Sequence, residues 1–409
     1  MASTLIKNAR IFDGEGLSCP ENGSIVIEGE HIREVGENLT IASEARTVDA
    51  GGRFLMPGLI DAHFHANTPS YDFYATDRMP KALLAAHAGK MLTDTLHRGF
   101  TTVRDAGGGD YGLWAALQEG LIDGPRFFFP GRAITQTGGH ADMRRRDFIE
   151  PCGCAYSGTL GQIVDGPDQM RHAVRDEFRK GAHQIKIFAS GGVSTDLAPL
   201  WMAHFTDEEI SVAVEEAARR RSYVMAHCHT DDGARRCLEQ GVRTIEHGSL
   251  ITPETAAMIE RAGAFVVPTL SAGKMIASHA ETIGLPASAA DKVKEVSELA
   301  KAAVENCARA GVKLGLGCDL HGHDFLKSQG RELMLRGEIQ SPTEVLCSAT
   351  SVNARIVRQE GKIGAIRSGA LADIIIVDGD PLTDLSLFAH PERTVAMVMK
   401  GGRLVRSSL

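Results

Sequence analysis

Eight short apolar segments alternate with stretches of helical periodicity through the middle of this 409-residue chain. Each apolar segment has the length of a buried strand, and the segment after it repeats its apolar residues every three to four positions. Alternating strands and helices are typical of a parallel sheet covered by helices, and eight such units predict a (β/α)8 barrel. The predicted strands are Phe54–Ile60, Phe100–Arg104, Arg126–Pro130, Gln184–Phe188, Ser222–Ala226, Arg243–Ile245, Ala264–Pro268 and Val312–Gly317.

Capping residues mark where some of the intervening helices begin. Thr206 and Glu209 have the spacing of a capping box, and Thr252 precedes a proline at a first helical position. Two connections, 131–167 and 189–205, are longer than ordinary strand-to-helix loops, so we expect them to shape a substrate pocket at the active face of the barrel. The predicted helices are Lys81–His97, Asp168–Lys180, Thr206–Arg220, Asp231–Gln240, Pro253–Ala262 and Ala290–Ala310.

Both ends of the chain have a different pattern, with short β-like runs separated by glycines. The first end contains Ile25–Ile27, and the last contains Ile374–Val377 and Val395–Val398. We therefore predict an α/β protein in which a β-sandwich domain, made of residues 1–53 and 362–409, flanks a catalytic barrel of residues 54–361.

The composition excludes several classes of protein. Hydrophobic residues make up 43% and charged residues 23%, which is typical of a globular enzyme and not of a disordered chain. The net charge of −8, without a long basic run, predicts no nucleic-acid and no membrane partner. With no signal-peptide pattern, we expect a cytoplasmic protein. The eight cysteines match neither a zinc ribbon nor a disulfide framework, so we expect them to be reduced and buried.

Residue types that bind metals occur on or just after five of the predicted strands. Two histidines follow the first strand at positions i and i+2, a spacing that points both side chains the same way in an extended segment. Because the carboxyl ends of the strands meet at the mouth of a barrel, we expect the whole set to converge there on zinc or a related metal. The predicted metal ligands are His63, His65, Lys186, His227, His247 and Asp319.

Residues 57–65 (PGLIDAHFH) resemble the strand-one signature of the amidohydrolase superfamily, the metal-dependent hydrolases. The resemblance covers essentially the whole chain. It implies two divalent metal ions, zinc being the first choice, and carbon dioxide, which carboxylates Lys186 so that the lysine bridges both ions. It also implies that hydroxide between the ions attacks the amide and that Asp319 serves as general base and acid. In this scheme one ion is held by His63, His65 and Asp319, and the other by His227 and His247.

Further segments are similar to the branch of Xaa-Pro dipeptidases (prolidases) and imidazolonepropionases. They are residues 101–108 (TTVRDAGG), 137–140 (TGGH), 186–192 (KIFASGG) and 246–248 (EHG). The resemblance implies hydrolysis of Xaa-Pro dipeptides, a small-molecule or dipeptide substrate, and a homo-oligomer. The alternatives are a carboxypeptidase-like or N-acyl amino acid hydrolase, a cyclic-amide or imidazolone hydrolase, and a non-catalytic scaffold. The presence of all six metal-site residues argues against the scaffold.

Residues on the loops are candidates for binding the substrate. His140 lies on the first long loop, where it is predicted to donate a hydrogen bond to the developing oxyanion. A substrate carboxylate in a partly desolvated pocket needs a cation, and in some relatives a tyrosine near position 229 contributes to that contact. A histidine stands at this position here, so the carboxylate partner stays open. Cys152 and Cys154 are expected to be packing residues. The candidate substrate contacts are His140, His229, Arg144, Arg145, Arg146 and His323.

Overall fold

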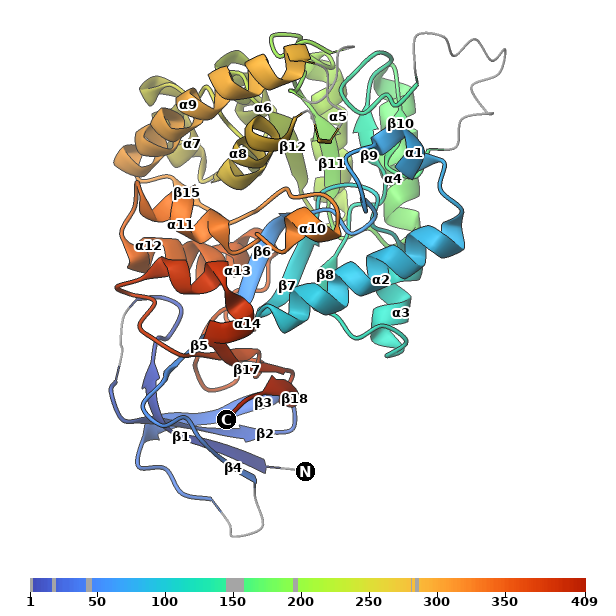
Figure 1. The fold of residues 1–409 in the computed structure, drawn as a ribbon. Helices are drawn as coiled ribbons and strands as arrows, with labels where there is room; N and C mark the ends of the chain where they lie inside the picture. The colour runs from blue at the N-terminus through green and yellow to red at the C-terminus, as the bar shows by residue number, and fades with distance from the viewer. Residues whose placement is uncertain are drawn as a thin grey trace.

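The two ends of the chain meet in one mixed sheet, which lies beside a ring of parallel strands (Figure 1). The structure is a computed structural model that describes residues 3–16, 20–41, 46–144, 158–193, 198–280, 282–283 and 287–409. In Figure 1 the first strands (blue) and the last strands (red) lie together at the bottom, below the parallel strands and their helices. The predicted α/β class is confirmed.

The mixed sheet contains strands from both ends of the chain, as predicted. Within the described residues it has eight strands, in the order β18-β17-β16-β5-β1-β2-β3, with β4 paired to β1. The domain boundaries at residues 53 and 362 stay a prediction. The strands are β1 (Ser3–Ile11), β2 (Gly23–Glu28), β3 (His31–Glu37), β4 (Arg46–Asp49), β5 (Phe54–Pro57), β16 (Ile374–Val377), β17 (Val395–Lys400) and β18 (Arg403–Ser407).

The parallel strands form a TIM-barrel-like ring. Two backbone hydrogen bonds, from Ala62 N to Leu316 O (2.8 Å) and from Asp319 N to His63 O (2.9 Å), join its last strand to its first. On the other side, His183 N donates to Phe129 O (2.8 Å) between the third and fourth strands. All eight predicted strand positions are occupied by β6 (Leu59–Phe64), β7 (Phe100–Asp105), β8 (Arg126–Phe128), β11 (Ile185–Phe188), β12 (Val224–Cys228), β13 (Thr244–His247), β14 (Phe265–Val267) and β15 (Lys313–Leu314).

The first predicted strand, Phe54–Ile60, is two strands in the structure. Its first half is β5, which pairs with β16 and β1 in the mixed sheet, and its second half begins β6 of the barrel. Gly58 separates them, and a Cβ at this position would lie 2.2 Å from Thr101 Oγ1 on the neighbouring strand. A side chain at position 58 would therefore push β6 away from β7.

The first long loop contains two short strands that were not predicted. These are β9 (Ala133–Thr135) and β10 (Gly161–Ile163), which extend the parallel sheet beside β11. The strands are only three residues long, too short for a periodicity to be visible in the sequence. They bring the start of the first long loop to the barrel.

Helices cover the ring, and their starts agree with the capping residues. The capping box of Thr206 with Glu209 is present, and the Thr252 side chain accepts the N–H of Thr255. The helices are α1 (Phe73–Asp77), α2 (Lys81–His97), α3 (Tyr111–Gln118), α4 (Pro167–Arg179), α5 (Asp207–Arg219), α6 (Asp231–Glu239), α7 (Pro253–Ala262), α8 (Leu270–His279), α9 (Ala287–Ala310), α10 (His323–Leu326), α11 (Arg331–Gly337), α12 (Pro342–Cys347), α13 (Asn353–Ile356) and α14 (Pro391–Thr394).

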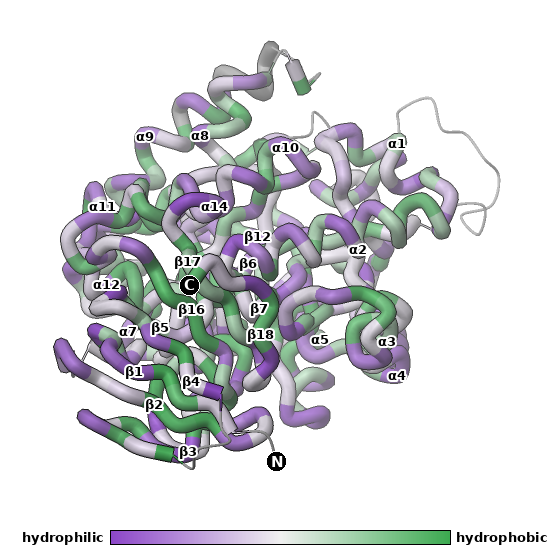
Figure 2. Tube along the Cα trace, turned by 60° about the horizontal axis from the view of Figure 1, so that its bottom comes forward, coloured by the Kyte–Doolittle hydropathy of each residue, from purple (hydrophilic) through white to green (hydrophobic). Residues whose placement is uncertain are grey.

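The buried strands are the hydrophobic ones. Figure 2 shows β16 and β17 largely in green, and both pack into two apolar clusters, one between the mixed sheet and the barrel and one within the mixed sheet. Among the described cysteines, four are buried and Cys347 is half-buried, and all five are free thiols. Cys152 and Cys154 lie outside the described residues. In the described part of the chain, no helix combines the length and the apolar character that crossing a membrane requires.

Candidate metal centre

One group of candidate ligands lies where the first and last barrel strands meet. His63 is on β6, and His65 follows that strand at position i+2, so both imidazoles point toward Asp319 after β15. The Nε2 atoms of His63 and His65 lie 3.5 and 3.3 Å from Asp319 Oδ1. Ligand atoms of all three residues lie within 4.8 Å of one another, a separation that fits a single metal ion.

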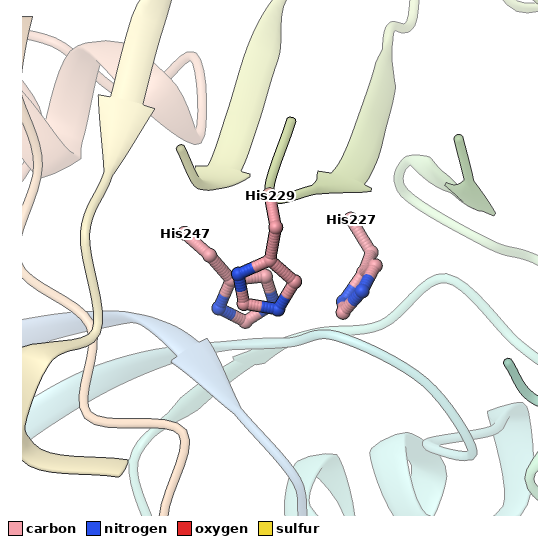
Figure 3. Close-up of side chains that lie close together, drawn as sticks. All are labelled: His227, His229 and His247. Atoms are coloured by element: carbon pink, nitrogen blue, oxygen red, sulfur yellow. The ribbon is translucent and has the colours of Figure 1, made fainter. Parts of the chain in front are cut away.

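A second group consists of three imidazoles on or just after β12 and β13. Figure 3 shows His227, His229 and His247 gathered at the ends of these strands. Their ligand atoms also lie within 4.8 Å of one another. The rings of His63 and His247 are 5.0 Å apart, so the two groups adjoin. His229, predicted as a substrate contact, thus lies among candidate metal ligands.

Hydrogen bonds orient the imidazoles by binding one nitrogen of each ring. His63 Nδ1 donates to Glu246 Oε2 (2.7 Å), His65 Nδ1 to the Gly107 carbonyl (3.3 Å) and His227 Nε2 to the Gly191 carbonyl (3.3 Å). These acceptors carry no proton, so an N–H of each ring points at them and the other nitrogen is left to face the ligand groups. Such outer contacts are typical of histidines that bind metals. The donor set of imidazoles and a carboxylate therefore fits two divalent cations such as zinc.

Lys186 lies on β11 and faces the same cavity as both groups. Its side chain is 1% exposed, and this burial lowers the pKa of the ammonium from 10.5 to about 8. At neutral pH the unprotonated amine is therefore far more populated in Lys186 than in a surface lysine. A lysine in this state can react with carbon dioxide, as the resemblance implies.

Left-handed backbone conformations occur at the ends of three consecutive barrel strands. His247 has φ 71°, Thr269 has φ 51° and Asp319 has φ 51°. Residues other than glycine rarely adopt such angles, and strain of this kind gathers at functional sites. Two of these residues are candidate ligands, and the third contacts one of them, because Thr269 Oγ1 lies 2.7 Å from His247 Nδ1.

A buried ionic network lies directly behind His63. Arg104 Nη2 donates to Glu246 Oε1 (2.8 Å) and Oε2 (3.0 Å), and Thr244 Oγ1 donates to Glu246 Oε1 (2.6 Å). Burial acts to raise the pKa of Glu246, but the guanidinium of Arg104 and the hydrogen bond from His63 hold it at about 2. The ionised carboxylate therefore keeps the Nδ1–H of His63 directed toward it. This network was not predicted from the sequence, although the charged residues inside the apolar strands β7 and β13 were a visible signal.

A cavity of about 1010 Å³ opens over both groups. His140 lines it and stacks on His227, with ring centroids 4.6 Å apart. Arg144 also lines it, and its Nε and Nη2 donate to Asp142 at 2.8 and 2.6 Å. His140, Arg144 and His229 thus reach the predicted pocket, whereas Arg145 and Arg146 lie outside the described residues.

The predicted substrate contact at His323 is not supported by the structure. His323 begins the short helix α10, and its Nε2 lies 2.9 Å from His87 Nδ1 on α2. It does not line the cavity, whereas His321 does, and His321 Nε2 lies 3.5 Å from Asp319 Oδ1. In an extended segment, His321 and His323 would point the same way, but the chain turns into α10 between them.

We expect the metal-free protein to lose stability in mild acid. Burial lowers the pKa of His63 and His229 to about 4 and that of His140 to about 3, whereas the unfolded chain returns them to 6.5. Between pH 6.5 and 4 the unfolded chain therefore binds more protons, so stability is greatest above pH 6.5 and falls as the pH is lowered. The melting temperature of metal-stripped protein should drop between about pH 7 and pH 5. Metal-loaded protein, the control, should resist acid further; an unchanged melting temperature of the stripped protein would contradict the prediction.

Comparison with known proteins agrees with this geometry. The model of the Amidohydrolase family matches residues 54–405. The chain is 32% identical to ochratoxinase from Aspergillus niger over 418 aligned residues, which cover 96% of this chain and 84% of that protein.

Solved structures are similar over the whole length of the chain. A prolidase complexed with N-methylphosphonate-L-proline has 39% identity and a TM-score of 0.96, with 100% of both chains covered. A Xaa-Pro dipeptidase with bound methionine in its active site has 29% identity and a TM-score of 0.88, covering 98% of this chain and 99% of that one. The family match, the barrel and the two ligand groups agree, and the chain belongs to the amidohydrolase family.

Proposed function

We propose that this protein is a binuclear amidohydrolase that cleaves the amide bond of Xaa-Pro dipeptides. The observation that carries the proposal is the pair of adjoining ligand groups around a buried lysine at the mouth of the barrel. The likeness to a prolidase over the full chain, with a proline phosphonate bound in that structure, supports the choice of substrate.

The donor set suggests how the centre is held together. One divalent ion would bind to His63, His65 and Asp319 and the other to His227 and His247, with carboxylated Lys186 joining them. When bound, two such ions, zinc by the preference of these donors, polarise a carbonyl and acidify water. His229 belongs to the second group and could serve there as an additional ligand.

Asp319 and His140 are the groups that we assign to proton transfer and to oxyanion binding. Burial acts to raise the pKa of Asp319, but the imidazoles of His63 and His321 hold it well below its usual range. Asp319 is therefore ionised and can accept a proton from water and pass it to the leaving nitrogen. Burial lowers the pKa of His140 to about 3, so this ring is neutral and donates one N–H toward the carbonyl oxygen.

The substrate carboxylate would lie toward the rim, where Arg144 lines the cavity. Asp142 accepts two hydrogen bonds from the Arg144 guanidinium, which fix the position of this cation at the cavity. Arg145 and Arg146 remain candidates on the sequence alone. Discrimination against an amidated substrate by one charge-assisted hydrogen bond would be about tenfold to a hundredfold.

We expect the enzyme to prefer Xaa-Pro dipeptides with a free carboxylate. The decisive measurement compares kcat/KM for Xaa-Pro, its C-terminal amide, Xaa-Arg and an N-acyl amino acid, each before and after removal of metal with a chelator. Activity should disappear with the metal and return when zinc is added. Equal rates for acid and amide would contradict the carboxylate contact, and faster cleavage of Xaa-Arg would favour a carboxypeptidase.

A second candidate function is hydrolysis of N-acyl amino acids. The relative from Aspergillus niger is an ochratoxinase, and the cavity here, about 1010 Å³, is at the upper end of the usual range for small-molecule sites. A cavity of this size leaves room for an acyl group larger than an amino acid. If the N-acyl amino acid is the fastest substrate in the same comparison, this function replaces the dipeptidase.

A further inference from the structure

Thr269 occupies the N-cap position of helix α8 but does not cap it. A threonine at this position ordinarily accepts a backbone N–H from the first turn of its helix. Here the Thr269 side chain makes no such bond, and its Oγ1 lies 2.7 Å from Nδ1 of His247 instead. The hydroxyl is thus used by a candidate metal ligand and not by the helix.

Glu332, from helix α11, caps α8 in place of Thr269. Its Oε1 accepts the N–H of Leu270 (3.1 Å) and its Oε2 accepts the N–H of Ser271 (2.7 Å). Glu332 is fully buried, and it does not line the cavity over the metal ligands. Burial raises its pKa to about 6, so a charged group is held here at some cost to the fold. A neutral side chain would have been sufficient to cap a helix.

The same turn of α8 also reaches the other ligand group. Ser271 Oγ donates to the Cys318 carbonyl (2.9 Å), which immediately precedes Asp319. One carboxylate therefore holds the turn that supports His247 on one side and Asp319 on the other. Both of these ligands have left-handed backbone angles, which makes outside support more important.

We infer that Glu332 is a positioning residue for the metal centre, acting through Thr269 and Ser271. If Glu332 did not accept the N–H groups of Leu270 and Ser271, these donors would be buried without partners. The nearest replacement would be the Thr269 hydroxyl, which would have to leave His247 to provide it. The inference depends on the proposed metal centre but not on the identity of the substrate.

Three substitutions test this route. Glu332→Gln keeps the shape but places an amide NH2 against one backbone N–H. Thr269→Val removes the hydroxyl and keeps the shape, and Thr269→Ser keeps the hydroxyl. The matched control is Glu209→Gln, because Glu209 is also buried and accepts the N–H groups of Gly166 (2.6 Å) at the start of α4 and Thr206 (2.7 Å) at the start of α5.

The readout is metal binding, measured by zinc release to a chromogenic chelator and by the visible spectrum of cobalt-substituted protein. Thr269→Val should weaken the metal site of His247, and Glu332→Gln the sites of both His247 and Asp319, each about tenfold to a hundredfold, as losses of outer contacts do. Thr269→Ser and Glu209→Gln should bind metal as the unmodified protein does. The double variant Glu332→Gln/Thr269→Val should be no weaker than Glu332→Gln alone, because Thr269→Val breaks part of the same route.

The outcomes separate this inference from the proposed function. Unaltered metal affinity in Glu332→Gln, additive losses in the double variant, or equal losses in Glu209→Gln would each overturn the inference. An unmodified protein that binds no metal would instead contradict the proposed centre itself. If Glu332→Gln does not fold, Glu332→Asp, which keeps the charge but shortens its reach, takes its place with the same expectation.

Discussion

Replacing Lys186 by methionine is expected to lower kcat/KM by more than about a hundredfold, the upper end of what losing an outer contact of a metal ligand causes. At a pKa of about 8, about a tenth of this amine is unprotonated at pH 7 and open to carbon dioxide. The carbamate is an anion that can join two cations, and methionine offers no charge in its place. Metal analysis should show loss of one or both ions per chain.

The control for Lys186 is Lys400→Met. Lys400 is also largely buried, and its pKa is also lowered. Its Nζ donates to the Gly124 carbonyl (2.6 Å), and neither residue lines the cavity. This variant should keep both metals. In Lys186→Ala, a short carboxylic acid with bicarbonate should restore part of the activity by occupying the place of the carbamate. A Lys186→Ala protein that holds two metals and turns over normally without additives would refute the carbamate.

Replacing Glu246 by glutamine should damage both stability and metal binding. The substitution removes the negative charge between Arg104 and His63 and leaves the guanidinium buried without its partner. Breaking a buried ion pair in this way costs about 3–5 kcal/mol of folding free energy. The loss of the charged acceptor at His63 Nδ1 should also weaken metal binding about tenfold to a hundredfold. Urea unfolding and metal titration measure the two effects separately.

Two further variants show which effect belongs to the metal. Glu177→Gln removes another buried carboxylate, which pairs with Arg132 (3.1 Å) and does not line the cavity. It should lose stability without losing metal affinity. Arg104→Met/Glu246→Gln should regain stability because no buried charge is left alone, but it should still bind metal weakly. Unaltered metal affinity in Glu246→Gln would show that His63 needs no charged outer acceptor.

The barrel could be predicted because its elements repeat with simple periods. The helices Lys81–His97 and Pro253–Ala262 begin and end where the sequence predicts, since their apolar residues have helical spacing, and Thr252 caps the second of them. The division of Phe54–Ile60 between two sheets could not be predicted, because both halves are equally apolar and fully buried. Only Gly58 marks the change, and the reason for it is a contact with Thr101 that the sequence does not reveal.

The candidate ligands could also be predicted, because the carboxyl ends of the strands of a barrel meet at one face however the side chains pack. The contacts that orient them were not, because Arg104 and Glu246 are 142 positions apart in the chain and meet only across the ring. Thr269 was equally hidden, as its position suggests helix capping and its role depends on Glu332. His323 does not line the cavity, because a helix begins there, whereas His321 is still in the loop and does line it.

The direct connection from β5 to β6 through Gly58 affects the order in which the protein can fold during synthesis. A ribosome makes β5 and the first two histidines early, but β16, the strand that pairs with β5 along its whole length, comes more than three hundred residues later. Until β16 is added, the strand leading into His63 lacks one of its lateral neighbours. A nascent chain should therefore capture metal late, and a product that ends before Ile374 should leave the ribosome with most of its barrel made and its first metal ligands poorly held.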